Sequence, residues 1–171
     1  MQTCSADNQF FYFAYGSNMS TRRIVARLPS AKTIATGFMI GYKLVFDKVS
    51  KDGSGKCDCE HTGSVGDRVY GVIFVVLCSE RAAFDRFEGV GTGYKPSAVR
   101  VDTDAGEMSA LTYVATNRQS GLPPYAWYKQ HVLVGAHEAN LPEDYVRKIE
   151  AAIAINDPDL TRTGKDNSAS R

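Results

Sequence analysis

Apolar positions along the chain form short runs of two kinds, and these runs predict a mixture of strands and helices. Brief aromatic or β-branched runs at residues 10–14, 69–77, 97–102 and 108–116 are typical of strands, and the run at 69–77 indicates a strand buried on both faces. Residues 33–47 also favour strand structure, as one bent strand or as two. Several strands with few regular crossover helices predict an α+β fold built on a small, strongly curved mixed β-barrel flanked by helices.

Helical spacing of apolar residues predicts four helices. The first follows Ser20, buries Ile24, Val25 and Leu28, and stops before Pro29, which disfavours a helical predecessor. A second helix covers residues 79–88 and a third covers 125–137. The last helix starts near residue 141, and its expected buried face consists of Tyr145, Ile149, Ala152 and Ile153.

Two stretches are too polar to belong to a core. Residues 48–67 are rich in Gly, Ser and charge, which predicts a long loop or an extended hairpin. Residues 156–171 lose their apolar positions, so we expect a disordered tail. We therefore predict a short lead at 1–9, a single domain at 10–155, and the tail.

The charges nearly balance, with 20 Lys and Arg against 19 Asp and Glu and a net charge of +1. This balance disfavours a protein that binds nucleic acid or an anionic membrane through a broad basic surface, and it favours a small-molecule or protein partner. The first residues do not resemble a signal peptide, and no apolar run approaches the ~20 residues of a membrane span. We expect a soluble cytoplasmic protein.

The cysteines predict free thiols, because Cys4, Cys57, Cys59 and Cys78 are few and unevenly spaced for a disulfide framework. Cys57, Cys59 and His61 could form half of a metal site, but a closed zinc site pairs two separated ligand halves, and the sequence offers no second half. The alternative, which we favour, is a mobile loop that holds two thiols. Cys78 ends an apolar run and is expected to be buried and inert.

The turn at residues 15–18 lies between the first strand and the first helix. A tight Gly-Ser-Asn turn at a helix start presents backbone N–H groups together with the positive end of the helix dipole, which suits a carboxylate or phosphate. The alternative is a plain strand-to-helix connection in which Ser17 and Asn18 cap their own backbone.

Glu88 is the second candidate, because it ends a predicted helix and a glycine-rich turn follows it. The negative end of the helix dipole and aromatic neighbours such as Phe87 and Tyr94 would disfavour its ionised form. The resulting rise in pKa suits a general base that works near neutrality. The alternative is a solvated surface glutamate that merely ends the helix.

Several motifs together resemble the γ-glutamylcyclotransferase family over about residues 10–150. They are the strings FYFAYGSNM at 11–19, VYGVIF at 69–74, FDRFEGV at 84–90 with the following GY at 93–94, LTY at 111–113 and GAHEANLP at 135–142. The combination of the first string with the glutamate motif is specific, whereas neither piece would be so alone. The resemblance implies a small curved β-barrel flanked by helices.

The resemblance also implies an activity and a site. Members of the family convert a γ-glutamyl amine or amino acid into 5-oxoproline and the free amine, without a metal or an organic cofactor. By motif, Glu88 would be the general acid and base. The residues implied to bind substrate are Tyr12, Ala14, Tyr15, Gly16, Ser17, Asn18 and Tyr128.

Two departures and two alternatives qualify this interpretation. The string YGSNM differs from the YGSL form of the glutathione-specific branch, which disfavours glutathione as the main substrate, and residues 48–67 resemble an insertion of bacterial-type members.

One alternative is a binding module without catalysis that senses a γ-glutamyl or other carboxylated metabolite. The other is a pathway-specific cyclotransferase that removes a γ-glutamyl protecting group. Homodimerisation occurs in the family, and the sequence leaves it open.

Overall fold

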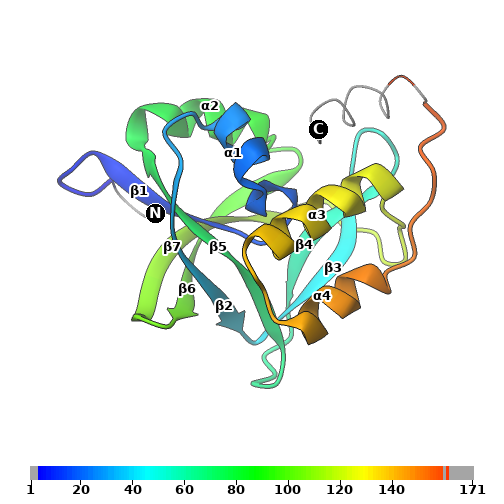
Figure 1. Ribbon diagram of the computed structural model, residues 1–171. Helices are drawn as coiled ribbons and strands as arrows, with labels where there is room; N and C mark the ends of the chain where they lie inside the picture. The colour runs from blue at the N-terminus through cyan, green and yellow to red at the C-terminus, as the bar shows by residue number, and fades with distance from the viewer. Residues whose placement is uncertain (1–3, 160, 162–171) are drawn as a thin grey trace.

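Five strands close into a barrel in a computed structural model, which describes residues 4–159 and residue 161 (Figure 1). Around the barrel they are β1 (Gln9–Ala14), β5 (Arg68–Leu77), β2 (Lys32–Ile40), β6 (Tyr94–Thr103) and β7 (Gly106–Ala115). Neighbouring strands are antiparallel except where β7 meets β1 in parallel and closes the barrel. The predicted small mixed barrel is confirmed.

A separate two-stranded hairpin joins β3 (Tyr42–Val49) to β4 (Gly55–His61) and extends beside the barrel. Gly41 has a φ of 79°, a left-handed conformation that glycine adopts readily, so the 33–47 run splits into two strands there. Of the two predictions for residues 48–67, the extended hairpin holds. The mobile loop with two thiols is wrong, because Cys57 and Cys59 are buried within β4.

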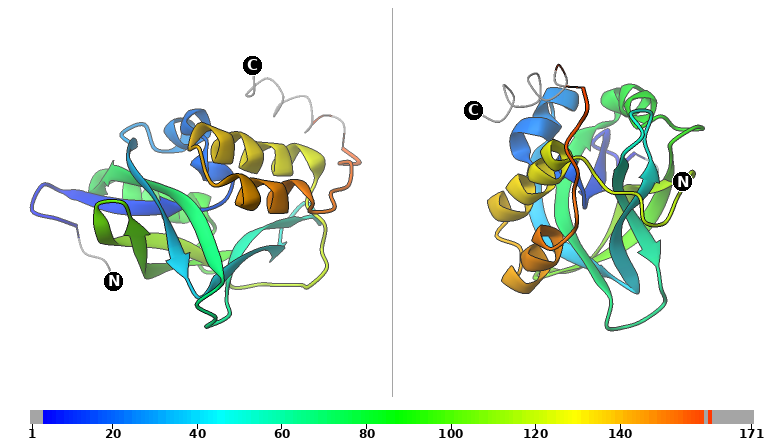
Figure 2. Two further views of the ribbon diagram at one scale, coloured as in Figure 1. Left: turned by 60° about the horizontal axis from the view of Figure 1, so that its bottom comes forward. Right: turned by 90° about the vertical axis from the view of Figure 1, so that its right-hand side faces the viewer.

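Among the described residues, four α-helices flank the barrel, with α3 and α4 side by side along one side (Figure 2). They are α1 (Thr21–Arg27), α2 (Arg81–Phe87), α3 (Ala126–Glu138) and α4 (Glu143–Glu150). Short 3-10 helices, η1 (Ser17–Met19) and η2 (Cys78–Glu80), precede α1 and α2. All four helices occur near the predicted positions.

The predicted buried faces of two helices were too wide. Ile24 and Leu28 are fully buried, but Val25 on the same predicted face is 40% exposed, because successive side chains on a helix point about 100° apart and only the side of α1 that carries Ile24 is buried. Helix α4 ends at Glu150, so residues 152–153 lie beyond its buried face, and Ile153 is 83% exposed. Local spacing alone does not show how long a helix stays against its neighbours.

An aromatic cluster fixes α2 on the barrel. The ring of Phe84 lies 4.9 Å from that of Tyr12 on β1 and 5.1 Å from that of Tyr113 on β7, and both pairs are edge-to-face. Such pairs add about 0.5–1.5 kcal/mol beyond the burial of their area. Because Glu88 follows α2 directly, this cluster also sets the place of that carboxyl group.

Helix α3 packs closely on the segment that contains η1. A Cβ atom on Gly135 would lie 2.6 Å from both Met19 Cβ and Ser20 N, so only glycine allows this approach. The side chain of Glu138 accepts a hydrogen bond from Thr21 N at 2.8 Å and so caps α1 from another helix. The η1 segment is therefore held by α3 as well as by its own turn.

We expect Gly135→Ala to lower the free energy of unfolding by about 1–3 kcal/mol, because the added methyl group overpacks a contact with backbone. Thermal or urea unfolding measures this change. Gly66→Ala is the matched control, since the nearest atom to its added methyl group is 3.8 Å away. Equal stability of the two variants would contradict the close packing of α3 on η1.

Cys4 and Cys78 form a disulfide, so the prediction of free thiols is wrong for this pair, as is that of an inert Cys78. Strand β1 pairs with β5, and the turn before β1 brings the chain back beside η2, where Cys78 N donates to Asn8 O at 2.9 Å. The partners are 74 positions apart, a distance over which spacing carries no signal. Cys57 and Cys59 are free and buried.

The described residues end within the segment that was predicted to be a disordered tail. Of residues 156–171, the structure describes 156–159 and 161, and the rest of that prediction lies outside the described residues. Trp127 Nε1 donates to Asp157 Oδ2 at 2.9 Å, and Asp157 is buried. The described start of this segment is therefore packed against α3.

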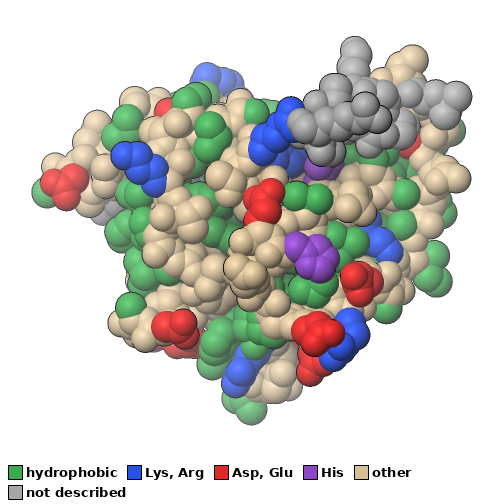
Figure 3. Space-filling model, in the orientation of Figure 1, with side chains coloured by type: hydrophobic (Ala, Val, Ile, Leu, Met, Phe, Trp, Pro, Cys, Tyr) green, Lys and Arg blue, Asp and Glu red, His purple; other side chains and the backbone are tan. Residues whose placement is uncertain are grey.

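On the face shown in Figure 3, acidic and basic side chains are interspersed, and no broad basic surface covers it. Arg147, for example, pairs with Glu143 at 2.7 Å on α4. Among the described residues, no helix has the length and apolar character needed to cross a bilayer.

Candidate active site

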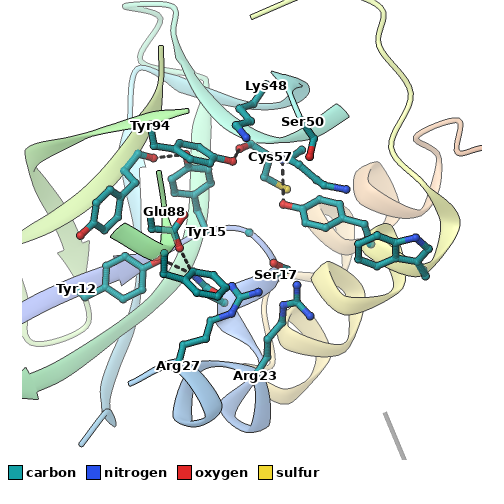
Figure 4. Close-up of a pocket in the computed structure, with 17 residues that line it drawn as sticks. Tyr12, Tyr15, Ser17, Arg23, Arg27, Lys48, Ser50, Cys57, Glu88 and Tyr94 are labelled. Atoms are coloured by element: carbon teal, nitrogen blue, oxygen red, sulfur yellow. Dashed lines mark hydrogen bonds between the residues drawn. The ribbon is translucent and has the colours of Figure 1, made fainter. Parts of the chain in front are cut away.

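A pocket of about 290 Å³ opens where β1 ends, beside the barrel and between α1 and the β3–β4 hairpin (Figure 4). Seven of the eight predicted site residues line it: Tyr12, Tyr15, Gly16, Ser17, Asn18, Glu88 and Tyr128. The eighth, Ala14, does not line the pocket and is fully buried in the core at the end of β1. The fold thus brings the 15–18 turn and Glu88 together across 70 positions of sequence.

Glu88 stands at the C-terminal end of α2, and Gly89, with a φ of 67°, turns the chain away after it. Its carboxyl group is partly buried, and Asn18 Nδ2 donates to Oε1 at 3.0 Å. Burial raises the pKa of Glu88, although the nearby Arg27 and the Asn18 hydrogen bond act in the opposite direction. The raised pKa brings the group closer to the range in which it can both accept and return a proton.

Asn18 links the turn to the candidate base. Its Nδ2 donates to the hydroxyl of Tyr12 at 3.1 Å as well as to Glu88, and its Oδ1 accepts from Arg27 Nη1. Among the described residues, no side chain caps the start of η1. The alternative in which Asn18 caps its own backbone is therefore wrong, and its amide instead holds the Glu88 carboxyl group.

Two tyrosines form hydrogen bonds with the β3–β4 hairpin, next to the 15–18 turn. Tyr128 Oη accepts from Cys57 N at 3.0 Å, and Tyr94 donates to Cys57 O at 2.8 Å. A Cβ atom on Gly16 would lie 3.0 Å from Cys57 Cβ, so a larger residue would crowd this junction. Burial raises the pKa of the Cys57 thiol to about 12, which leaves it un-ionised and a poor nucleophile near neutral pH.

Within the described part of the chain, four cationic side chains line the pocket, and the sequence analysis singled out none of them. Arg23 and Arg27 come from α1, and Lys48 and Lys56 come from the hairpin. In Figure 4, Lys48 lies across the pocket from the two arginines. The sequence could have indicated the two arginines, because residues four apart on a helix share a face, and this face follows the 15–18 turn directly. No such pattern indicates the two lysines, since the place of the hairpin depends on tertiary contacts.

The sequence of this chain is similar to those of known enzymes. The chain is 37% identical over 150 residues to a γ-glutamylcyclotransferase from Bos taurus, across 83% of this chain and 78% of that protein. It is 35% identical over 154 residues to the Homo sapiens γ-glutamylcyclotransferase, across 85% and 79% of the two chains. The chain belongs to the γ-glutamylcyclotransferase family.

The family assignment agrees with the fold. A solved structure of a γ-glutamyl cyclotransferase superposes with a TM-score of 0.81 at 33% identity, covering 88% of this chain and 92% of that one. The AIG2-like family matches residues 68–149, a region that includes α2 and Glu88. The resemblance drawn from the sequence motifs is confirmed at the level of the family and of its fold.

Proposed function

We propose that the protein is a γ-glutamylcyclotransferase that converts a γ-glutamyl amino acid or amine into 5-oxoproline and the free amine. The observation that carries the proposal is the Asn18–Glu88 hydrogen bond, because it joins the turn to a partly buried carboxyl group inside one pocket. The mammalian relatives from Bos taurus and Homo sapiens carry the name γ-glutamylcyclotransferase, which supports the proposal.

The chemistry needs a folded substrate and one group that carries a proton. The α-amine of the substrate attacks its own γ-carbonyl carbon, the C–N bond to the leaving amine breaks, and a five-membered lactam forms. Glu88 accepts the proton of the attacking nitrogen and returns it to the leaving nitrogen. No water is consumed and no protein nucleophile takes part, so the un-ionised Cys57 has no role in bond making.

The other groups of the pocket suit the charges of this substrate. Backbone N–H groups of the 15–18 turn, where η1 starts, would bind the glutamyl carboxylate or the carbonyl oxygen as it gains charge. Arg27 stacks on Phe87 at 4.1 Å and bonds Asn18, so it adds positive charge close to Glu88. The glutamyl half of the substrate is thus expected beside the turn, with its amine toward Glu88.

Incubation of the purified protein with γ-glutamyl-alanine and related dipeptides tests the proposal. We expect 5-oxoproline and the free amino acid in equal amounts, measured by chromatography with mass detection. Release of glutamate instead would show hydrolysis and would contradict the cyclisation. Ligand-dependent rises in melting temperature without product, across a broad γ-glutamyl panel, would instead indicate a binding module.

A further inference from the structure

Lys48 occupies a distinctive position in the pocket. It lies near the end of β3, is half-buried, and its Nζ stands 4.9 Å from the centre of the Tyr94 ring. The same ammonium group would be 3.4 Å from a Cβ atom on Gly93, so it rests against the turn that follows Glu88. In Figure 4, Lys48 and Ser50 enter from the hairpin side and face the α1 arginines across the pocket.

The contacts of Lys48 differ from those of its neighbour Lys56. Lys56 forms an ion pair with Asp52 at 2.9 Å and stacks on Trp127 at 4.5 Å. Within the part of the chain that the structure describes, no carboxylate lies within ion-pair distance of Lys48, and Glu88 and Asp52 attract it only from farther away. A partly desolvated ammonium group without a close counter-ion is costly, and an anionic ligand would offset that cost.

The substrate charges indicate which anion Lys48 binds. A γ-glutamyl amino acid carries two carboxylates and one ammonium group. In the proposed mechanism the glutamyl ammonium group faces Glu88, and the glutamyl carboxylate lies beside the turn and α1. The carboxylate of the leaving amino acid is then the one charged group of the substrate that still lacks a partner. Lys48 is the hairpin cation available to meet it, and the hydroxyl of Ser50, just after β3, lines the same pocket as a second donor.

We propose that Lys48 determines specificity by binding the carboxylate of the leaving amino acid. This inference rests on the proposed function and narrows it. Substrates that release an α-amino acid are favoured over γ-glutamyl amines of the same size that lack a carboxylate, because only a carboxylate forms an ion pair with the partly buried ammonium group.

The test compares γ-glutamyl-alanine with γ-glutamyl-alaninamide, which differ only in the carboxylate. We expect wild-type protein to favour γ-glutamyl-alanine in kcat/KM by roughly 10- to 100-fold. Lys48→Gln should collapse that ratio toward one, mainly through a higher KM for γ-glutamyl-alanine, and Lys48→Arg should retain part of it. Lys51→Gln is the matched control, because Lys51 is exposed on the same hairpin, and it should keep the wild-type ratio.

Two results would overturn the inference. One is a wild-type ratio near one, and the other is a Lys48→Gln variant that loses activity on both substrates while keeping their ratio. If Lys48→Gln does not fold, the wild-type ratio and the Lys48→Arg variant still decide the question. The absence of 5-oxoproline from either substrate with wild-type protein would refute the proposed function itself, which is a distinguishable outcome.

Discussion

Glu88→Gln is expected to lower kcat by about 10²- to 10⁴-fold, because the amide cannot accept or return the proton that passes between the two nitrogens. The fold should keep its stability or gain some. Burial raises the pKa of Glu88, which means that the folded state disfavours the ionised form near neutral pH, and the neutral amide removes that cost. Steady-state release of 5-oxoproline and thermal unfolding measure the two effects.

Controls separate this loss of chemistry from a general change of charge. Glu107→Gln removes an exposed carboxylate on β7 and should leave both activity and melting temperature unchanged. Glu88→Asp keeps the carboxylate but shortens its reach, and it should fall between wild type and Glu88→Gln. A kcat of the Glu88→Gln variant above one-tenth of the wild-type value would contradict the role of Glu88 as the general acid and base.

Asn18→Ala is expected to lower kcat/KM by roughly 10- to 100-fold, since a hydrogen bond to a charged group is lost and Glu88 is no longer held in place. Its effect on pH dependence has a definite sign. The amide lowers the pKa of Glu88, so its removal raises that pKa further. Because the ionised form is the base, the acidic limb of the kcat/KM profile should move to higher pH.

Tyr12→Phe is the matched control for the Asn18 prediction. It removes the other acceptor of the Asn18 amide but leaves the bond from Asn18 to Glu88 in place. Its acidic limb should therefore move less than that of Asn18→Ala. A profile that does not move in Asn18→Ala would show that Asn18 supports the turn without acting on Glu88.

Local patterns predicted much of the fold, because strand and helix periodicities reflect which side chains face a core. The apolar run at 69–77 became β5, although Leu77 at its end is 40% exposed, and the break at Gly41 follows from backbone freedom. The pairing of the 15–18 turn with Glu88 came from the motif resemblance, since spacing says nothing about contacts 70 positions apart.

Apart from the α1 arginines, the features that sequence analysis missed depend on tertiary contacts. The Cys4–Cys78 disulfide needs the β1–β5 pairing, and the place of Lys48 in the pocket needs the hairpin to fold back beside the barrel. The exposure of Val25 depends on which side of α1 is buried. Composition and periodicity describe each segment by itself, so they do not show which segments meet.

The structure of the Glu88→Gln variant with bound γ-glutamyl-alanine tests the central claim most directly. The account predicts that the dipeptide lies in the pocket, with its α-amine within about 3 Å of the residue 88 side chain and its glutamyl carboxylate against the 15–18 turn. A dipeptide bound with its amine directed away from residue 88, or bound outside this pocket, would contradict it.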